Sequence, residues 1–482
     1  MKASDQRHLL LMVALLLFGY ALGAARLNAD ILWLDELYSL SNMGVFATPF
    51  DWFEVVDSLT EHSPNHVPLY FFLGARWAAL VGWSQLSMRF PSLLIGLLLI
   101  AWTYRFAADI FDRKTAATAA LLLTTSGFVL MYFHEIRMYS LLLLLTVIHA
   151  WLYWRLTSAK SARRWQWLCF ILTAVSLLYT HVFSLFVFVG LGLRHLLCFS
   201  RIRRWRHIVA AWALSALAFL PYLPRYLHGA LAERTIPALQ DSALGAPQLA
   251  RELGNIIVNG VEVLWLPIAL LAALALWQRR HPAITQMLLV WSGIILSLML
   301  FNEFFPLIDR LRFRFFLVSM PFFAIICAHL LFRPRRWEFV MLPFALVWIA
   351  GGLRIHGLGD SWTYSGRTSI FVDIPPLHRH ANALQSKTRE LDKALGFSQA
   401  KWVDWKLRHG KSIADYYYGV TLNREQAFVI TDGSASHSLE DLDNLIDDHP
   451  YLILIYNPAE KPLIFGEVVA ALEVNASARS RD

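Results

Sequence analysis

The stretch ILWLDELYSL, residues 31–40, places two adjacent carboxylates, Asp35 and Glu36, in an otherwise apolar run. It follows the uncharged apolar segment 9–25. Carboxylates at the edge of a bilayer are costly unless they face water or a partner, so this pair is a candidate functional site. The alternative is an acidic pair that only ends a helix in headgroup water.

The composition around this stretch predicts a polytopic membrane protein. Of 482 residues, 57% are apolar and only 16% are charged, whereas soluble domains average about 25% charged residues. Lys2 and Arg7 precede the first apolar segment, which lacks a cleavage site, and this favours a retained span that starts in the cytoplasm. Further apolar runs of membrane-crossing length follow; they are 115–134, 138–154, 165–193, 207–224, 263–278, 281–302, 315–332, 339–353 and the shorter 90–104.

Basic residues lie between these runs and predict the topology. The net charge is +8, but orientation in the membrane explains it without nucleic-acid binding, because positive loops stay in the cytoplasm. If every apolar run, including 67–83, crosses the membrane, the basic loops after the first span would lie on the outer side, against this rule. The run 67–83 contains Arg76 and two glycines, and we interpret it as an interfacial or re-entrant helix on the outer side. This leaves about eleven transmembrane helices.

On this topology the polar groups gather on the outer side. The first outer loop, 27–89, contains the acidic pair, and residues 132–139 form a second outer turn. The run 165–193 is long enough for two short spans that meet near His181. We expect His181 to be a polar residue at a span end rather than a ligand. The remaining outer loops are 225–259 and 302–314.

The composition changes after residue 353. The segment 354–482 is rich in charged residues and contains two short apolar runs, 427–431 and 451–456, that are typical of buried strands. Helical spacing occurs at 376–395 and 439–447. We therefore expect a transmembrane domain over 1–353 and a small extracytoplasmic α/β domain over 354–482.

The residue types of the outer loops suggest a chemistry. A carboxylate at a membrane surface suits removal of a proton from a hydroxyl nucleophile, or coordination of a divalent cation. Arginines suit a phosphate group, which they bind in a bidentate manner. A membrane site with both implies a substrate with a phosphate leaving group and a lipid tail, as in polyprenyl-phosphate sugars.

Five motifs resemble one family. WLDE (33–36), HSPNHVPLY (62–70) and SMRFPSLLIG (87–96) resemble the opening of the C-type integral-membrane glycosyltransferases (GT-C), in particular the superfamily of protein O-mannosyltransferases and lipid A aminoarabinose transferase. EIRMYSL (135–141) and RFRFFLVSMP (312–321) resemble its second outer motif and its late arginine motif. The resemblance covers roughly the first 350 residues, and its specificity comes from the order and spacing of the motifs.

The resemblance implies a GT-C-like all-α fold and transfer of one sugar, with inversion, from a polyprenyl-phosphate donor to an acceptor lipid, glycan or protein. Asp35 would be the general base, and Glu36 would support it. The donor phosphate would bind Arg137, Arg310, Arg312, Arg314 and His66. The family often has His-Pro-Pro or Lys-Pro-Pro where this chain has His66-Val67-Pro68. We expect a cell inner membrane, with the active site and the terminal domain on the periplasmic face.

Several alternatives stay open. A divalent cation would have as candidate ligands Asp35, Glu36, His62, His66 and His134, because His62 and His66, four positions apart, would share one helix face; a histidine pair without a metal is the other interpretation. Arg312 and Arg314 would, alternatively, only snorkel to headgroups. The rival functions are a transporter or flippase of a lipid-linked sugar, and a non-catalytic assembly protein that docks through its terminal domain.

Overall fold

The computed structural model describes residues 3–356, except for the short gaps 26, 28–33, 46–47, 160, 235–242, 278–281, 309–311 and 333–336, together with 428–430 and 452–454. The chain divides into two compact units. The first comprises residues 1–29 and 49–377, and the second comprises 30–48 and 378–482.

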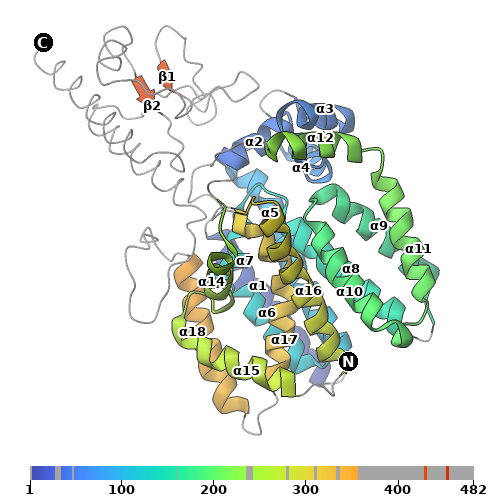
Figure 1. The fold of residues 1–482 in the computed structure, drawn as a ribbon. Helices are drawn as coiled ribbons and strands as arrows, with labels where there is room; N and C mark the ends of the chain where they lie inside the picture. The colour runs from blue at the N-terminus through green and yellow to red at the C-terminus, as the bar shows by residue number, and fades with distance from the viewer. Residues whose placement is uncertain are drawn as a thin grey trace, which may run out of the picture. The chain divides into compact units, whose positions relative to one another are not determined.

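The first unit is a helical bundle (Figure 1). Its α-helices are α1 (Ala3–Ala24), α3 (Trp52–His62), α4 (Leu69–Val81), α5 (Gln85–Ile110), α6 (Arg113–Thr124), α7 (Gly127–Leu130), α8 (Tyr139–Ser158), α9 (Arg164–Thr180), α10 (Ser184–Leu197), α11 (Trp205–Phe219), α12 (Leu223–Arg234), α14 (Ala246–Ile257), α15 (Trp265–Trp277), α16 (Pro282–Phe304), α17 (Met320–Leu331) and α18 (Trp337–His356). Its 3-10 helices are η1 (Met131–His134), η2 (Phe199–Arg201), η3 (Glu262–Leu264) and η4 (Arg312–Ser319).

The long apolar helices confirm a multi-pass membrane protein. In the described part of the chain, four helical segments are long and apolar enough to cross a membrane. They are α5, α8, α16 and the segment 313–331, which consists of most of η4 and the whole of α17. Two bent pairs, α6 with 127–134 and α11 with 223–229, raise the number to six if each is one span. The total of eleven stays a prediction. Helix α4 has 13 residues, which at about 1.5 Å per residue is too short to cross the hydrocarbon core.

The run 115–134, expected to be one span, is instead broken after α6 and bent by 62°. Asn259, from another part of the chain, forms hydrogen bonds on both sides of this break. Its Oδ1 atom accepts a hydrogen bond from the Gly127 N–H at 3.0 Å, and its Nδ2 atom donates to the Thr125 and Trp348 carbonyls at 3.0 and 2.8 Å. Asn259 has a φ of 53°, a left-handed conformation that asparagine tolerates better than most residues.

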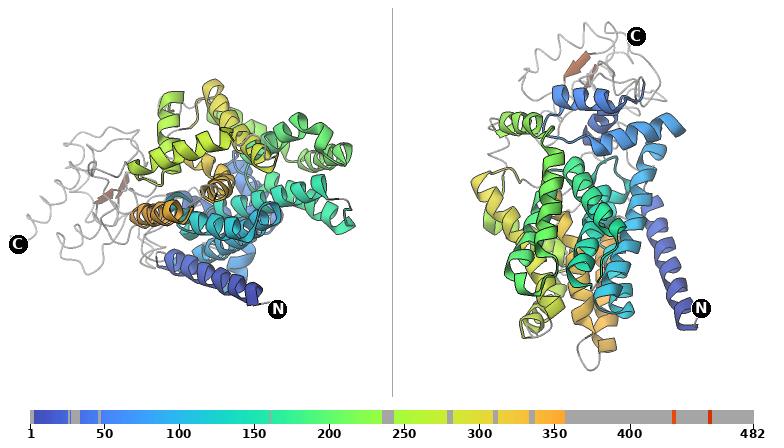
Figure 2. Two further views of the ribbon diagram at one scale, coloured as in Figure 1. Left: turned by 90° about the horizontal axis from the view of Figure 1, so that it is seen from below. Right: turned by 90° about the vertical axis from the view of Figure 1, so that its right-hand side faces the viewer.

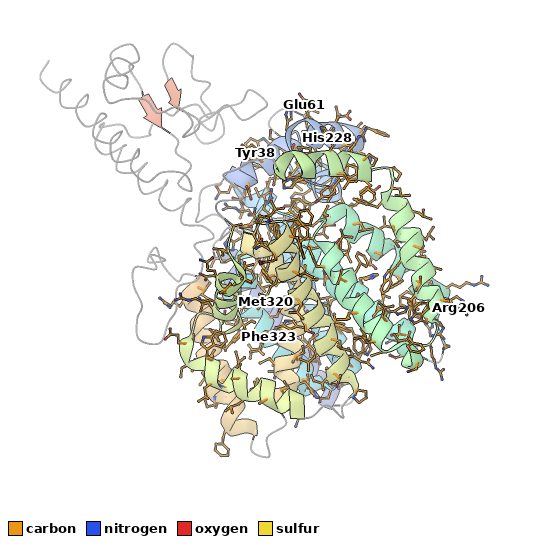
Figure 3. All side chains as sticks on the ribbon, viewed as in Figure 1. Tyr38, Glu61, Arg206, His228, Met320 and Phe323 are labelled. Atoms are coloured by element: carbon orange, nitrogen blue, oxygen red, sulfur yellow. The ribbon has the colours of Figure 1, made fainter. Side chains whose placement is uncertain are left out.

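Helices α3 and α12 lie across one end of this bundle (Figure 1 and the right-hand view of Figure 2). An apolar cluster holds them there: Val56 of α3 and Leu178 of α9 pack with Phe219 and Tyr222 at the α11–α12 bend. Glu61 and His228 mark this end in Figure 3, and Arg206 lies toward the other end.

The opposite end carries charged contacts between neighbouring helices. Asp109 Oδ2 at the end of α5 accepts hydrogen bonds from Arg155 Nη1 and Trp151 Nε1 of α8, at 2.9 and 2.8 Å. These bonds fix the ends of α5 and α8 relative to each other.

The second unit contains α2 (Leu34–Asn42), β1 (Phe428–Ile430) and β2 (Leu452–Leu454) among its described residues. Both strands fall within the runs where the sequence predicts them. They pair in parallel, with Val429 opposite Ile453, and parallel neighbours require a crossover connection. The predicted helices 376–395 and 439–447 lie outside the described residues, so the α/β domain stays a prediction.

Candidate active site

The turn between η1 and α8, residues 135–138, is buried and braced from two sides. Ser92 Oγ of α5 donates to the Glu135 carbonyl at 2.5 Å, and Ser140 Oγ donates to the Tyr132 carbonyl at 2.6 Å. The backbone of α5 also approaches closely, because a Cβ atom at Gly96 would lie 2.5 Å from Phe133 Cδ1. These contacts hold Arg137, which is only 4% exposed, at a fixed position.

Arg137 contacts His66 from the loop between α3 and α4. The Nη2 atom of Arg137 lies 3.1 Å from His66 Nε2, and His66 Nδ1 lies 2.7 Å from Asn65 Oδ1. A guanidinium only donates hydrogen bonds, so Nε2 is the acceptor and Nδ1 carries the hydrogen that Asn65 accepts. His66 is therefore a neutral imidazole, and the Tyr222 hydroxyl holds its backbone by donating to the His66 carbonyl at 2.9 Å.

Arg314 of η4 reaches the same place from the late arginine motif. The guanidinium carbons of Arg314 and Arg137 lie 5.4 and 6.0 Å from the centre of the Tyr139 ring, the distance range of cation–π contacts. The loop before η4 is held by Asn302, whose Oδ1 accepts from the N–H groups of residues 307 and 308 at 3.1 and 2.7 Å. Two arginines that the sequence assigned to phosphate binding thus converge on one buried aromatic ring.

His181 is a further member of this group. It lies in the turn between α9 and α10, with its ring centre 5.7 Å from that of Tyr139 and 5.6 Å from that of Phe315. The Phe183 N–H donates to His181 Nδ1 at 3.0 Å. Burial, together with the charges of Arg137 and Arg314, lowers the pKa of His181 to about 3. The sequence treats His181 as an ordinary span-end residue, because only the fold brings it near both arginines.

The other predicted phosphate ligands are partly described. Arg310 lies outside the described residues, and Arg312 begins η4 but its side chain lies outside them. The group that we call the arginine–histidine cluster therefore consists of His66, Arg137, Tyr139, His181 and Arg314, of which Arg137 and Tyr139 are buried and the others half-buried. Two cations beside neutral imidazoles, in surroundings of low polarity, suit a phosphate group.

The predicted histidine pair is not on one helix face, and that expectation is wrong. Helix α3 ends at His62, and Ser63 caps its C-terminus, so the chain turns before His66. The His62 ring contacts Glu61 at 3.7 Å, whereas the ring nitrogens of His66 contact Asn65 and Arg137. His134 lies buried in η1. Among the described residues, no group of three or more His, Cys, Asp or Glu side chains is arranged to hold a metal ion.

The acidic pair belongs to the second unit. Asp35 and Glu36 occupy the first turn of α2, where negative charge is favourable because the helix dipole is positive. Glu36 is buried and Asp35 is half-buried. The Ser39 hydroxyl donates to the Asp35 backbone carbonyl at 2.8 Å.

Comparison with known proteins gives one family match by sequence. Residues 64–228 match the family model of dolichyl-phosphate-mannose-protein mannosyltransferases. This segment contains His66, Arg137, Tyr139 and His181. No curated protein sequence matches the chain.

Solved structures have a similar fold at low sequence identity. ArnT from Cupriavidus metallidurans bound to undecaprenyl phosphate is 12% identical, with a TM-score of 0.56 over 92% of this chain and 89% of that one. The apo form of ArnT is 16% identical, with a TM-score of 0.51 over 70% of this chain; the match spans 62% of that chain. The archaeal oligosaccharyltransferase AglB from Archaeoglobus fulgidus, in complex with an inhibitory peptide and a dolichol-phosphate, is 14% identical, with a TM-score of 0.47 over 95% of this chain and 65% of that one.

The likeness to ArnT concerns the fold, and the family match concerns the segment that contains most of the arginine–histidine cluster. The motifs had predicted both. Residues 64–228 thus match the family model of dolichyl-phosphate-mannose-protein mannosyltransferases, and the fold of the chain is similar to that of ArnT.

Proposed function

We propose that this protein transfers a single sugar from a polyprenyl-phosphate carrier to an acceptor lipid, glycan or protein outside the cytoplasm. The observation that supports this most directly is the convergence of Arg137 and Arg314 on Tyr139. Buried arginines in a membrane protein are costly and usually serve a functional site. ArnT, whose fold is similar, binds undecaprenyl phosphate, and this carrier is the first to test.

The two guanidiniums have a defined task in this reaction. The donor phosphate carries one negative charge while it is bonded to the sugar, and it gains a second when the bond to the anomeric carbon breaks. Cations that are already in place stabilise this developing charge without reorganisation, which is commonly the largest contribution to catalysis. His66 aligns Arg137 for this task, and Arg310 and Arg312 complete the phosphate site in this proposal.

Asp35 supplies the base. The acceptor oxygen attacks the anomeric carbon from the face opposite the phosphate, and the bond from that carbon to the phosphate oxygen breaks. The phosphate leaves with the electron pair, and Asp35 takes the proton of the acceptor hydroxyl, so the configuration inverts. Glu36 supports Asp35 or helps to bind a divalent cation; no step depends on such a cation.

The proposed topology has about eleven spans, with the arginine–histidine cluster and residues 354–482 on the periplasmic face of the inner membrane. The contacts of Asp109 with Arg155 occur where the basic loops begin, at the end that we assign to the cytoplasm. Reporters fused after Arg113 and after Leu353 test the assignment. The first should report from the cytoplasm and the second from the periplasm, and the reverse result for either contradicts the topology.

Sugar transfer is tested with the purified protein in lipid nanodiscs and with cells that lack it. Such cells should accumulate a lipid-linked sugar, because a transferase leaves its donor unused. Asp35→Asn should insert and fold but lose transfer, whereas Asp109→Asn, at the end of the bundle that we assign to the cytoplasm, should keep it. If the protein moves lipid-linked sugar across the membrane without consuming it, it is a flippase and not a transferase. Normal turnover by Asp35→Asn would exclude Asp35 as the base.

A further inference from the structure

One ring nitrogen of His181 accepts a hydrogen bond within the turn between α9 and α10, and the other ring nitrogen does not take part in the turn. The Phe183 N–H donates to Nδ1 at 3.0 Å, so Nδ1 is an acceptor and, in the neutral ring, Nε2 carries the hydrogen. Within the described part of the chain, this Nε2–H makes no hydrogen bond to a protein acceptor. The structural role of His181 therefore explains Nδ1 and leaves the Nε2 donor without a structural function.

The position of the ring indicates what this donor serves. Its centre lies 5.7 Å from the Tyr139 ring, on which the guanidiniums of Arg137 and Arg314 both converge. Phe315, which follows Arg314 directly, is 5.6 Å away, and Phe183 is 5.4 Å away. Aromatic rings thus enclose the imidazole next to two cations, in a place where water competes weakly for a hydrogen bond.

We propose that the Nε2–H of His181 donates a hydrogen bond to a non-bridging phosphate oxygen of the polyprenyl-phosphate carrier, beside Arg137 and Arg314. This inference rests on the proposed function and adds a catalytic residue to its phosphate site. It assigns to the α9–α10 turn a direct contact with the substrate.

The charges around His181 fit this role. Burial and the two neighbouring arginines lower its pKa to about 3, so the ring is neutral in the protein without substrate. A neutral donor adds a phosphate contact without a third positive charge, which would repel the two arginines before the carrier binds. When the leaving phosphate gains its second negative charge, the same hydrogen bond becomes stronger.

Three substitutions of His181 distinguish the roles of its two ring nitrogens. Glutamine places an amide N–H near the position of Nε2, whereas asparagine places its oxygen near the position of Nδ1 and does not reach Nε2. Phenylalanine keeps the aromatic packing and removes both nitrogens. Loss of a hydrogen bond to a charged group corresponds to roughly a 10- to 100-fold change. We expect this loss in kcat/KM and in undecaprenyl phosphate affinity for His181→Asn and His181→Phe, and a near-normal His181→Gln.

The outcomes distinguish this proposal from the proposed function. If wild-type protein does not bind undecaprenyl phosphate, the function itself is wrong for this carrier. If wild type and His181→Phe bind it equally, only the assignment of His181 fails. Recovery by asparagine but not by glutamine would show that the Nδ1 bond to the turn matters, and this also overturns the assignment.

A measurement on the wild-type protein covers the case in which the variants do not fold. Diethyl pyrocarbonate modifies neutral imidazole nitrogens, and mass spectrometry locates the product. Saturating undecaprenyl phosphate should protect His181 but not His207, which is exposed at the start of α11. Equal modification of His181 with and without the carrier would contradict the proposed contact.

Discussion

The Nε2 atom of His66 lies 3.1 Å from Nη2 of Arg137, although 71 positions separate the two residues. This bond fixes the tautomer of the histidine and the orientation of the guanidinium together. It joins the loop after α3 to the turn before α8, and through Tyr139 it is connected to Arg314. The predictions below test the parts of this arrangement separately.

Replacement of Arg137 by glutamine should reduce kcat/KM for sugar transfer by about 100- to 1,000-fold, as for the loss of one group that stabilises developing charge. The side chain keeps much of its length but loses the positive charge. Arg155→Gln is the matched control, because Arg155 bonds to Asp109 at the other end of the bundle. Equal losses in both variants would show a general effect on folding and not on the phosphate site.

Removal of the His66 side chain should have a smaller effect than loss of Arg137. In His66→Ala the guanidinium loses the acceptor that orients it, and we expect about a 5- to 20-fold fall in kcat/KM. His66→Gln offers a side-chain oxygen to Arg137 and should recover most of the activity. If His66 instead bound the phosphate directly, glutamine would not restore it and undecaprenyl phosphate affinity would fall as far as in Arg137→Gln.

Substitution of Asn259 tests what determines the bend after α6. Asn259→Ala removes three buried hydrogen bonds and should lower the unfolding free energy by about 3 kcal/mol or more. Asn259→Gly loses the same bonds but tolerates the positive φ, so its melting temperature in detergent should lie between those of Asn259→Ala and wild type. A melting temperature for Asn259→Ala within one degree of wild type would exclude this role.

The low pKa of His181 predicts a pH dependence of stability. The folded value is about 3 and the ordinary value is 6.5, so the unfolded chain takes up this proton first as the pH falls. The stability is complete above about pH 6.5 and is lost as the pH falls toward 3. Glutamine does not titrate, so between about pH 7.5 and 5 the melting temperature of wild type should fall more than that of His181→Gln. Parallel curves would contradict a neutral, partly buried His181.

Local patterns were sufficient for the class of protein and for several of its helices and strands. The lengths of the apolar runs predicted a multi-pass helical protein, and the runs 427–431 and 451–456 contain the two strands. The division of 165–193 into two short helices near His181 is also confirmed. These features follow from the composition of each segment, because hydrophobicity and turn residues act over a few positions.

Local patterns failed where a distant contact decides the structure. The apolar run 115–134 predicts one helix. However, the Gly127 N–H donates its hydrogen bond to Asn259, which lies 132 positions away. The i, i+4 spacing of His62 and His66 suggests one helix face, but the helix ends at His62. His181 has no motif of its own, and its relation to Arg137 and Arg314 exists only in the folded bundle.

The sequence by itself determined the membrane class and the resemblance to C-type glycosyltransferases, because these depend on residue types and their order. It also predicted Arg137 and Arg314 as phosphate ligands, and this role stays a prediction. The tertiary structure alone decided that both guanidiniums meet at one tyrosine ring, that His66 serves Arg137 rather than a neighbouring histidine, and that His181 lies beside them. The physical reason is that a buried charge takes its partners from whatever the packing of helices brings near, and that packing is a property of the whole bundle.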